Sequence, residues 1–548
     1  MIEVKNKENN KSDFIREKDN NLNSNKSDAK KNRKIISIEN LLCLFIILCP
    51  LFDILSFITR NIWQSKISVS TFIRPIIPVL VGIYIFIKAD KKHKKFFLIL
   101  AFTYILYAII HLYIMKSLIT GCSYGNVINE LQYVFNYTFL IIYFIIYVYT
   151  FVKKSENKSN INDNLKKLRN SIVIMNFIYI VSIYFSIIIG KSSPTYTETG
   201  LGYKGFIESG NSLSAILILS MFIVLYVIKD NSKATREFLI SIKKDKFNND
   251  AKSKEIDNKN INEKKTNSTQ INFKENITMF FLALITYILT SVYLIKLIGT
   301  RTGLIGTVLV LFVFTLADIL INKNKKIAIV GISIICIIAV LVVSFGSNTI
   351  KRRREVNLSQ YTIIDEKTGE IGTMTGDMLR IKNKIIDNEL EEGYMSEAQK
   401  ESVIDLYNYT KKHNIAGNDT RRQQLMYNIF LMKNQKNIIT ILFGNGYKTN
   451  FREMVMENEF ASMFLNFGLI GFILYMGPFI ATFIFSVYVA IKNKKFNLEY
   501  VILQCALGLS FVLSWMSGYV FFATSCMIVI VVISTILLMK LKNINEKS

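Results

Sequence analysis

The chain has 548 residues, of which 51% are hydrophobic and 12% aromatic, and its mean hydropathy is +0.31. Apolar runs of about 20 residues, the length that crosses a bilayer, recur along it and exclude an ordinary soluble protein. The formal charge of +26 does not indicate nucleic-acid binding. Most Lys and Arg lie in short segments between apolar runs, where such residues orient membrane proteins.

The predicted elements follow a polar start. Residues 1–34 are rich in Asn, Lys, Ser and Asp and predict a disordered cytoplasmic tail. No signal peptide is expected, because the first apolar run begins late and shows no small-residue cleavage pattern. Twelve apolar runs then predict an all-α polytopic membrane protein. The spans are 36–58, 70–88, 96–115, 131–152, 170–190 and 211–228 within residues 35–228, then 277–298, 303–321 and 327–345 within residues 277–345, then 461–490, 499–516 and 519–540 within residues 461–548.

The connections between these runs alternate in charge. The basic ones are residues 88–95, 153–169, 229–276, 322–326 and 492–495. The positive-inside rule therefore places both termini in the cytoplasm. The long insert at 229–276 lacks hydrophobic periodicity and is predicted to be a charged, solvated cytoplasmic linker.

The largest connection, residues 346–460, falls on the extracytoplasmic side. A loop of this length is more often functional than idle. It contains helical patterns such as SEAQKESVIDLYNYTKKH, and a second pattern begins at NDT, where Asn418, Asp419 and Thr420 are candidate N-caps. We therefore expect a partly helical loop.

Two ionisable residues lie within predicted spans. Asp53 follows Pro50 in the first span, and Arg74 lies early in the second. A charge within a span is costly and faces protein or water, so both are candidate substrate-binding residues. For Arg74, snorkelling of the side chain to the interface is an equally good explanation.

Arg301 is a stronger candidate. It lies between Gly299 and Gly303 in a short extracytoplasmic turn, where the backbone can approach a ligand. Its guanidinium offers a planar fork to phosphate. The alternative explanation is that the two glycines form a helix-packing pair.

Further arginines occur in the large loop. The cluster KRRR contains Arg352, Arg353 and Arg354 on the side that the positive-inside rule disfavours, and it indicates an anionic ligand. Lipid headgroups are the alternative. Arg421 and Arg422 follow the candidate caps, so a guanidinium is expected near the start of a helix.

Paired acids stand where the large loop meets the next span. FGNGY predicts a tight turn at Gly444 and Gly446. Glu457 and Glu459 then flank Asn458 at the seam between loop and span. Acids in the first turn of a helix interact favourably with its N-terminus, which is the structural explanation. The arginines on the same side of the membrane favour a catalytic role for the two glutamates.

Other kinds of chemistry have no support in the sequence. It contains no P-loop, no Asp-x-Asp pair and no clustered His and Cys ligands, so neither a nucleotide cofactor nor a metal is expected. The six cysteines give no disulfide framework, because five of them lie within apolar runs.

The order and topology of these motifs resemble the O-antigen polymerase and ligase family of membrane glycosyltransferases, from about residue 40 to about residue 540. That family has an Arg turn, a large outer loop with an Arg before a helix, a Gly-x-Gly turn, a His-Asn pair and a Gly-x-x-Gly. The counterparts are Thr300-Arg301-Thr302, Arg421 or Arg422, Gly444-Asn445-Gly446, Glu457-Asn458 and Gly468-Leu469-Ile470-Gly471, with GYKGFIESGNSLSAIL at 202–217. The resemblance implies a GT-C-like fold.

One position departs from the family pattern. Where ligases of the family carry a histidine taken as the catalytic base, this chain has Glu457, which resembles Gram-positive exopolysaccharide and capsule polymerases. The resemblance implies a bacterial cell membrane location and a polyprenyl-pyrophosphate oligosaccharide as donor. It also implies other polysaccharide-assembly membrane proteins as partners.

On this hypothesis Glu457 orients or deprotonates the acceptor hydroxyl. Arg301 and one of Arg421 and Arg422 stabilise the departing pyrophosphate. Glu459 assists in sugar binding. Because a pyrophosphate leaving group already carries the activation energy, the hypothesis needs no nucleotide or metal.

Three other functions fit parts of the sequence. A ligase would differ from a polymerase only in its acceptor. A 12-helix transporter or flippase of lipid-linked sugars would share the layout. Such carriers often show two related halves, whereas this sequence has no repeat and most of its charges gather at the outer face. A receptor or scaffold would leave the Arg and Glu set unexplained.

Overall fold

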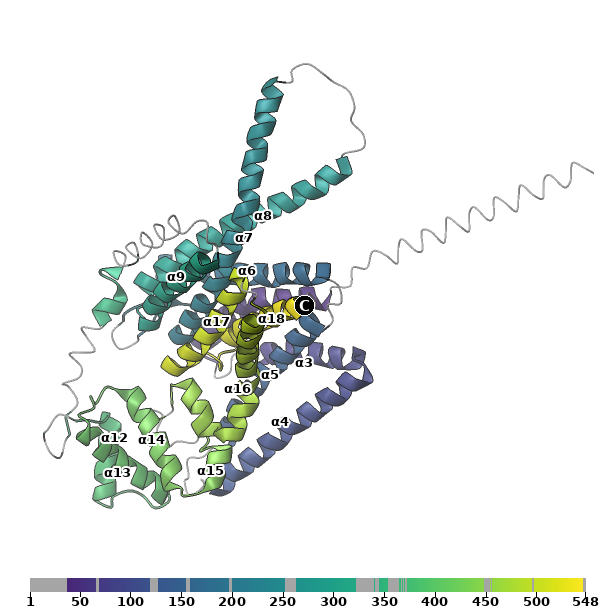
Figure 1. The fold of residues 1–548 in the computed structure, drawn as a ribbon. Coiled ribbons are helices and arrows are strands. Elements are labelled where there is room, and N and C mark those ends of the chain that lie inside the picture. Colours follow the sequence, from purple (N-terminus) through teal and green to yellow (C-terminus); the bar gives the residue numbers. More distant parts are fainter. Residues whose placement is uncertain are drawn as a thin grey trace, which may run out of the picture. The chain divides into compact units, whose positions relative to one another are not determined.

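A computed structural model describes residues 37–65, 69–118, 127–153, 158–196, 200–251, 263–321, 340, 344–352, 364–365, 367, 369, 372–447, 454, 456–494 and 497–545. Helices dominate these residues, and one short hairpin interrupts them (Figure 1). The predicted tail at 1–34, nearly all of the predicted span at 327–345, and Arg353 and Arg354 lie outside the described residues.

The elements alternate between long apolar helices and short connections. Those before the large loop are α2 (Ile38–Phe57), η1 (Ile58–Ile62), α3 (Val69–Lys88), α4 (Lys91–Leu118), α5 (Val127–Tyr147), η2 (Val148–Lys153), α6 (Lys158–Ile188), β1 (Ser193–Pro194), β2 (Tyr203–Gly205), α7 (Gly210–Ala251), α8 (Glu263–Val292), η3 (Tyr293–Leu297) and α9 (Arg301–Ile321). Those that follow are α12 (Gly376–Ile386), α13 (Glu397–Lys412), α14 (Thr420–Asn434), α15 (Ile438–Phe443), α16 (Glu459–Asn493), α17 (Leu498–Met516) and α18 (Thr524–Asn545).

Ten helices of the described chain are long and apolar enough to cross a membrane, which confirms an all-α polytopic membrane protein. They coincide with ten of the predicted spans. The predicted span at 70–88 is also helical, as α3. The helices differ greatly in burial: 83% of the apolar window of α18 is buried inside the protein, against 22% of that of α4.

The last helix lies at the centre of the bundle. α18 packs against α5, α6, α7, α16 and α17, and every residue from 525 to 537 is buried. Its sequence there, SCMIVIVVISTIL, is apolar on nearly every face. A helix that is apolar all round is stable only when protein or lipid covers every side.

The insert at 229–276, predicted as a charged, solvated linker, is helical over its described residues. α7 continues to Ala251 and α8 begins at Glu263. The physical reason is that helix nucleation is costly and propagation is cheap. The membrane-embedded parts of α7 and α8, which pack on each other, supply the nuclei, and the Lys- and Glu-containing flanks extend them.

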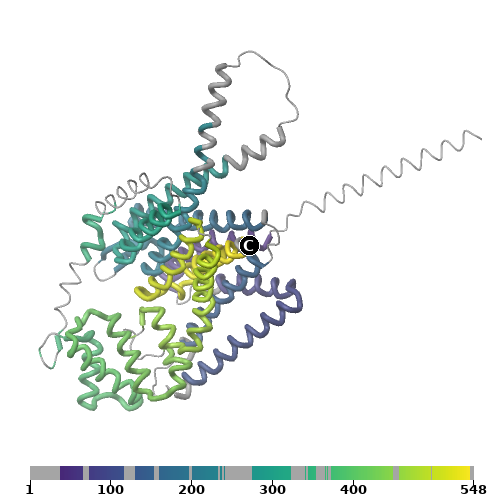
Figure 2. The backbone as a smooth tube through the Cα atoms, viewed as in Figure 1, coloured from purple at the N-terminus to yellow at the C-terminus, as the bar shows by residue number. Residues whose placement is uncertain are grey.

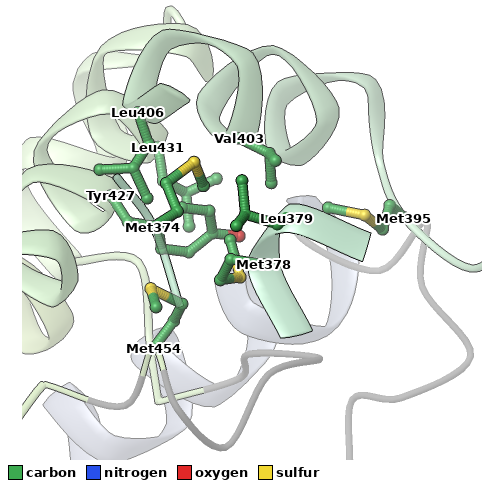
Figure 3. Packing of buried hydrophobic residues seen from close by; sticks show 9 residues of the cluster. All are labelled: Met374, Met378, Leu379, Met395, Val403, Leu406, Tyr427, Leu431 and Met454. Atoms are coloured by element: carbon green, nitrogen blue, oxygen red, sulfur yellow. The ribbon is translucent and has the colours of Figure 1, made fainter. Parts of the chain in front are cut away.

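The large loop forms a small helical domain, here called the loop domain, which contains α12 to α15. Ser396 and Gln399 make a reciprocal capping box at the start of α13. Asp419 caps α14 by accepting a hydrogen bond from the Arg422 N–H. Methionine, leucine and tyrosine side chains fill the core between α12, α13 and α14 (Figure 3). The chain then passes into α16, against which α15 packs (Figure 2).

A buried ion pair joins α12 to the segment before it. Lys382 Nζ lies 3.0 Å from Asp365 Oδ2, and both side chains are at most 5% exposed. Burial acts to raise the pKa of Asp365, but hydrogen bonds from Lys382 and from the Lys367 N–H outweigh it and hold the pKa below its ordinary value of 3.8. The pair therefore stabilises the loop domain when the carboxylate is ionised.

Replacing Lys382 with Met should lower the free energy of unfolding of the loop domain by about 3 to 5 kcal/mol, because Asp365 would stay buried without its cation. In the wild type the contribution is present above pH 3.8 and is lost as the pH falls through the lowered folded-state pKa. Thermal unfolding and limited proteolysis measure both effects. Lys400→Met is the control, since the Lys400–Glu397 pair is exposed, and an equal loss there would contradict the prediction.

Candidate functional site

The hairpin of β1 and β2 positions Tyr196. The Tyr196 N–H donates to the Leu201 carbonyl oxygen at 3.1 Å and prolongs the pairing of the two antiparallel strands. The ring packs on the turn before α9, where a Cβ added to Gly299 would lie 3.7 Å from Tyr196 Cε2. Gly299 has a φ of +80°, the left-handed region that glycine adopts without strain.

Arg301 begins α9 directly after this turn. The Thr300 hydroxyl accepts a hydrogen bond from the Gly303 N–H at 3.1 Å, as an N-cap does. The Arg301 side chain is exposed. Gly303 instead serves close packing, because an added Cβ would lie 2.9 Å from the Leu294 carbonyl oxygen. Gly299 thus forms the turn and Gly303 allows close packing.

Arg352 reaches the same place from the segment that follows the predicted span at 327–345. Asn348 Nδ2 donates to the Leu297 carbonyl oxygen at 2.9 Å, which holds this segment against the turn before α9. The Arg352 guanidinium carbon then lies 3.1 Å from the centroid of the Tyr196 ring. This is a cation–π contact.

Arg421 and Glu457 form an ion pair at the start of α14. Arg421 Nε donates to Glu457 Oε2 at 3.0 Å, and Arg421 Nη1 donates to the Met516 carbonyl oxygen at 2.8 Å. The Glu457 N–H donates to Gln424 Oε1 at 3.0 Å. The side chains of the pair are 41% and 42% exposed, so a substrate can reach them.

Arg422 has different surroundings. Its Nη2 donates to the Tyr409 hydroxyl at 3.1 Å, and its guanidinium lies 5.7 Å from the Tyr409 ring. Successive helix residues point about 100° apart, so two adjacent arginines face different neighbours. The contacts therefore favour Arg421 over Arg422 as the partner of Glu457.

Tyr196 is the common neighbour of these charges. Arg352, Arg421, Arg301 and Glu457 all act on the pKa of its hydroxyl. Burial raises that pKa above its ordinary value of 10.0 and outweighs the three guanidinium groups, which lower it. Tyr196 therefore stays protonated at neutral pH. Among the described residues that act on Tyr196, three groups are positive and one is negative, and such an excess of positive charge attracts anions.

Glu459 has surroundings unlike those of Glu457. It is 3% exposed. Its Oε2 accepts from the Val520 and Phe521 N–H groups at 2.7 and 2.8 Å, and its Oε1 accepts from the Tyr137 hydroxyl at 3.2 Å. These contacts hold the α17–α18 connection against α16 and α5 and favour an anchoring role. Asn458 occupies the N-cap position of α16 without a side-chain cap bond.

Gly444 and Gly446 lie against the backbone of α16. Their φ values are +88° and +71°, and the Gly446 N–H donates to the Asn466 carbonyl oxygen at 2.9 Å. A Cβ on Gly444 would collide with the same carbonyl group. α16 is interrupted there at Gly468, whose φ is 71°. Close packing against backbone accounts for Gly444 and Gly468, and close packing against the Met115 side chain accounts for Gly446.

A buried pair that sequence reasoning passed over supports this turn. His111 Nε2 lies 2.7 Å from Glu130 Oε1, and His111 Nδ1 lies 2.8 Å from the Phe443 carbonyl oxygen. Because a carbonyl only accepts, Nδ1 carries a hydrogen. Glu130 Oε2 also accepts from the Tyr447 N–H at 2.6 Å. The available signal was an ionisable residue within one predicted span and another directly before the next.

Asp53 and Arg74 pair with each other inside the bundle. Arg74 Nη2 donates to Asp53 Oδ1 at 2.6 Å, and their side chains are 14% and 17% exposed. Asp53 Oδ2 also accepts from Ser525 at 2.8 Å and from Tyr179. The carboxylate thus joins α2, α3, α6 and α18, and these contacts favour a structural role for the pair.

The fold and the site together define a polytopic membrane protein with a solvent-accessible, anion-attracting cluster beside a carboxylate. The family model described as O-antigen ligase like membrane protein matches residues 37–245 and 269–544. The chain belongs to this family, as its motifs indicate, and is a membrane enzyme of O-antigen or related glycan assembly. No curated protein matches it.

Glu459→Ala should lower the free energy of unfolding by about 2 to 5 kcal/mol, because the buried Val520 and Phe521 N–H groups would lose their acceptor. Glu457→Ala should cost less than about 1 kcal/mol, as expected for an exposed pair. Thermal unfolding of both variants in one membrane mimetic makes the comparison. Equal losses would mean that Glu459 does not anchor the α17–α18 connection.

Proposed function

We propose that this chain is a glycosyltransferase that polymerises polyprenyl-pyrophosphate-linked oligosaccharide units into a surface polysaccharide. The observations that support the proposal are the contact of Arg352 with Tyr196, the ion pair of Arg421 with Glu457, and the electrostatic influence of Arg301, Arg421 and Glu457 on the Tyr196 hydroxyl. These residues come from five segments spread over about half of the chain. The excess of positive charge among these described residues has a purpose if an anion binds there.

The anion would be the pyrophosphate of the donor. Guanidinium groups match phosphate oxygens in bidentate hydrogen bonds. When the bond between the anomeric carbon and the pyrophosphate oxygen breaks, the electron pair moves onto that oxygen, and fixed cations stabilise it. Arg301 and Arg352 supply these charges. Tyr196 adds a protonated hydroxyl that can donate a hydrogen bond to the same group.

Glu457 would act on the acceptor. Its Oε2 is held by Arg421 at 3.0 Å, so the carboxylate is oriented while part of it stays exposed. The acceptor hydroxyl attacks the anomeric carbon and passes its proton to Glu457 as the new glycosidic bond forms. Arg421 is therefore a positioning residue for Glu457 as well as a charge near the pyrophosphate.

The proposed topology places this chemistry at the extracytoplasmic end of the bundle. There the polyprenyl chain can stay in the bilayer while the sugars project into water. We prefer polymerisation to ligation because Glu457 stands where ligases of the family carry a histidine. In this respect the chain resembles the Gram-positive polymerases. Both termini are then cytoplasmic.

Glu457→Gln should lower the polymerisation rate about 100-fold to 10,000-fold, the usual contribution of a general base. The test compares a deletion strain that carries the wild type or the variant, and measures the length distribution of surface glycan and of lipid-linked intermediates. Single repeat units should accumulate on the lipid in both the deletion strain and the variant. A fall below about tenfold would remove Glu457 from this role.

The same measurement separates the other functions. Full-length chains stranded on the lipid would identify a ligase. Unchanged glycan with normal intermediates would contradict both enzymes. Intermediates that stay on the cytoplasmic face would instead support transport.

Arg421→Ala and Arg422→Ala form a matched pair, since the residues are adjacent and each loses one charge. Arg421→Ala should lower activity about 100-fold or more, because it removes a charge from the site and the partner of Glu457. Arg422→Ala should change activity by less than about tenfold, because only its hydrogen bond to Tyr409 is lost. In vitro chain extension with a lipid-linked donor measures both. Equal losses would contradict the assignment of Arg421.

A further inference from the structure

α4 lies at the edge of the bundle and leaves a groove beside it. It is 28 residues long and packs only lightly against α3 and α5 (Figure 1). The groove between these helices has a volume of about 520 Å³ and is lined by residues that include Gly82, Phe86, Phe97, Ala101 and Ile142.

The lining of the groove is almost entirely apolar. Among the described residues that line it, only Tyr104 and Thr138 bring polar side chains. The Tyr104 hydroxyl donates to the Leu474 carbonyl oxygen at 2.6 Å, and the Thr138 hydroxyl donates to the Val134 carbonyl oxygen at 2.8 Å, so both hydrogens have acceptors. Water would gain little here, and the groove suits a hydrocarbon chain.

Positive charge gathers at one end of the groove. The turn between α3 and α4, residues 88–95 (KADKKHKK), holds five lysines and one aspartate. Asp90 pairs with His93. Phe86 and Phe97 line the groove and lie two residues from Lys88 and Lys95. An acyl chain in the groove would therefore bring its headgroup phosphate to the lysines.

We propose that this groove and the 88–95 turn bind an acidic phospholipid from the leaflet that faces the turn. Charge complementarity selects an anionic headgroup, and each lysine near such a headgroup strengthens binding about fivefold. Aromatic contacts fix the turn beside the end of α5: the Tyr149 ring lies 5.6 Å from His93 and 5.5 Å from Phe97.

The polyprenyl donor fits this place less well. The residues of α4 that contact α16 and the end of α15, Tyr107 and His111, lie farther along the helix. At 1.5 Å per residue, His111 is about 24 Å from Lys95. A donor whose pyrophosphate meets the arginines near Tyr196 would leave the lysines without an anion. A second lipid satisfies them.

A lipid in the groove would also help to hold α4 in place. The Tyr107 hydroxyl donates to the Phe467 carbonyl oxygen at 2.7 Å, and His111 holds the Phe443 carbonyl oxygen. α4 therefore connects the groove to the Gly444–Gly446 turn and to the interruption of α16. A lipid wedged beside α4 would steady these contacts.

The test titrates the purified full-length chain with dioleoylphosphatidylglycerol or dioleoylphosphatidylcholine and counts bound lipids by native mass spectrometry. One site should prefer phosphatidylglycerol by about tenfold or more. Lys91→Gln/Lys95→Gln should lower the affinity for phosphatidylglycerol by about 10-fold to 30-fold and leave phosphatidylcholine unchanged. Ala101→Phe should weaken both lipids by filling the groove.

The matched control is Lys492→Gln/Lys494→Gln, which removes the same charge from another exposed basic turn that is predicted on the same side. This control should bind phosphatidylglycerol as the wild type does. Equal loss in the two double variants would overturn the proposal, because the preference would then reflect net charge. Displacement of phosphatidylglycerol by polyprenyl phosphate in the wild type would also overturn it and assign the groove to the donor's tail.

Discussion

Buried carboxylates determine how the helices of this molecule are held together. Away from water an ionised oxygen needs donors from the protein, and those donors come from distant parts of the chain. Asp53 draws together α2, α3, α6 and α18. Glu130 joins α5 to α4 and to Tyr447, and Glu459 joins α16 to α5 and the α17–α18 connection. Glu457 is different, because it is half exposed and has one cationic partner.

The buried carboxylates thus hold the helix bundle together, whereas Glu457 belongs to the candidate site. The arginines near Tyr196 start from backbone positions that tight packing defines: the turn at Gly299, the segment at Asn348 and the capped start of α14. Their long side chains can adjust while their origins stay in place. Such an arrangement suits a ligand whose charge is delocalised over several oxygens. The backbone is already in place and only the guanidinium groups adjust, so binding costs little free energy.

The sequence predicts the fold far better than the site. Long apolar runs identify the spans, because a backbone in lipid has few alternatives to a helix. The sequence also singles out Arg301 and Glu457, which lie at span ends, and Arg421, which follows the candidate helix caps. It does not single out Tyr196, because the role of this residue depends on contacts with residues more than 100 positions away. The choice between Arg421 and Arg422 depends on which side of α14 faces Glu457. The pairing of His111 with Glu130 depends on how α4 packs on α5.

The central place of α18 has a consequence for biogenesis. The helix that fills the middle of the bundle is made after the other described spans, and 83% of its apolar window is covered by protein in the folded molecule. Until it inserts, the inward faces of α5, α6, α7, α16 and α17 can meet only lipid or one another. The Val520 and Phe521 donors of Glu459 arrive just ahead of it. The bundle therefore acquires its core only when α18 inserts, and a chain interrupted before it lacks both that core and the backbone donors that hold Glu459.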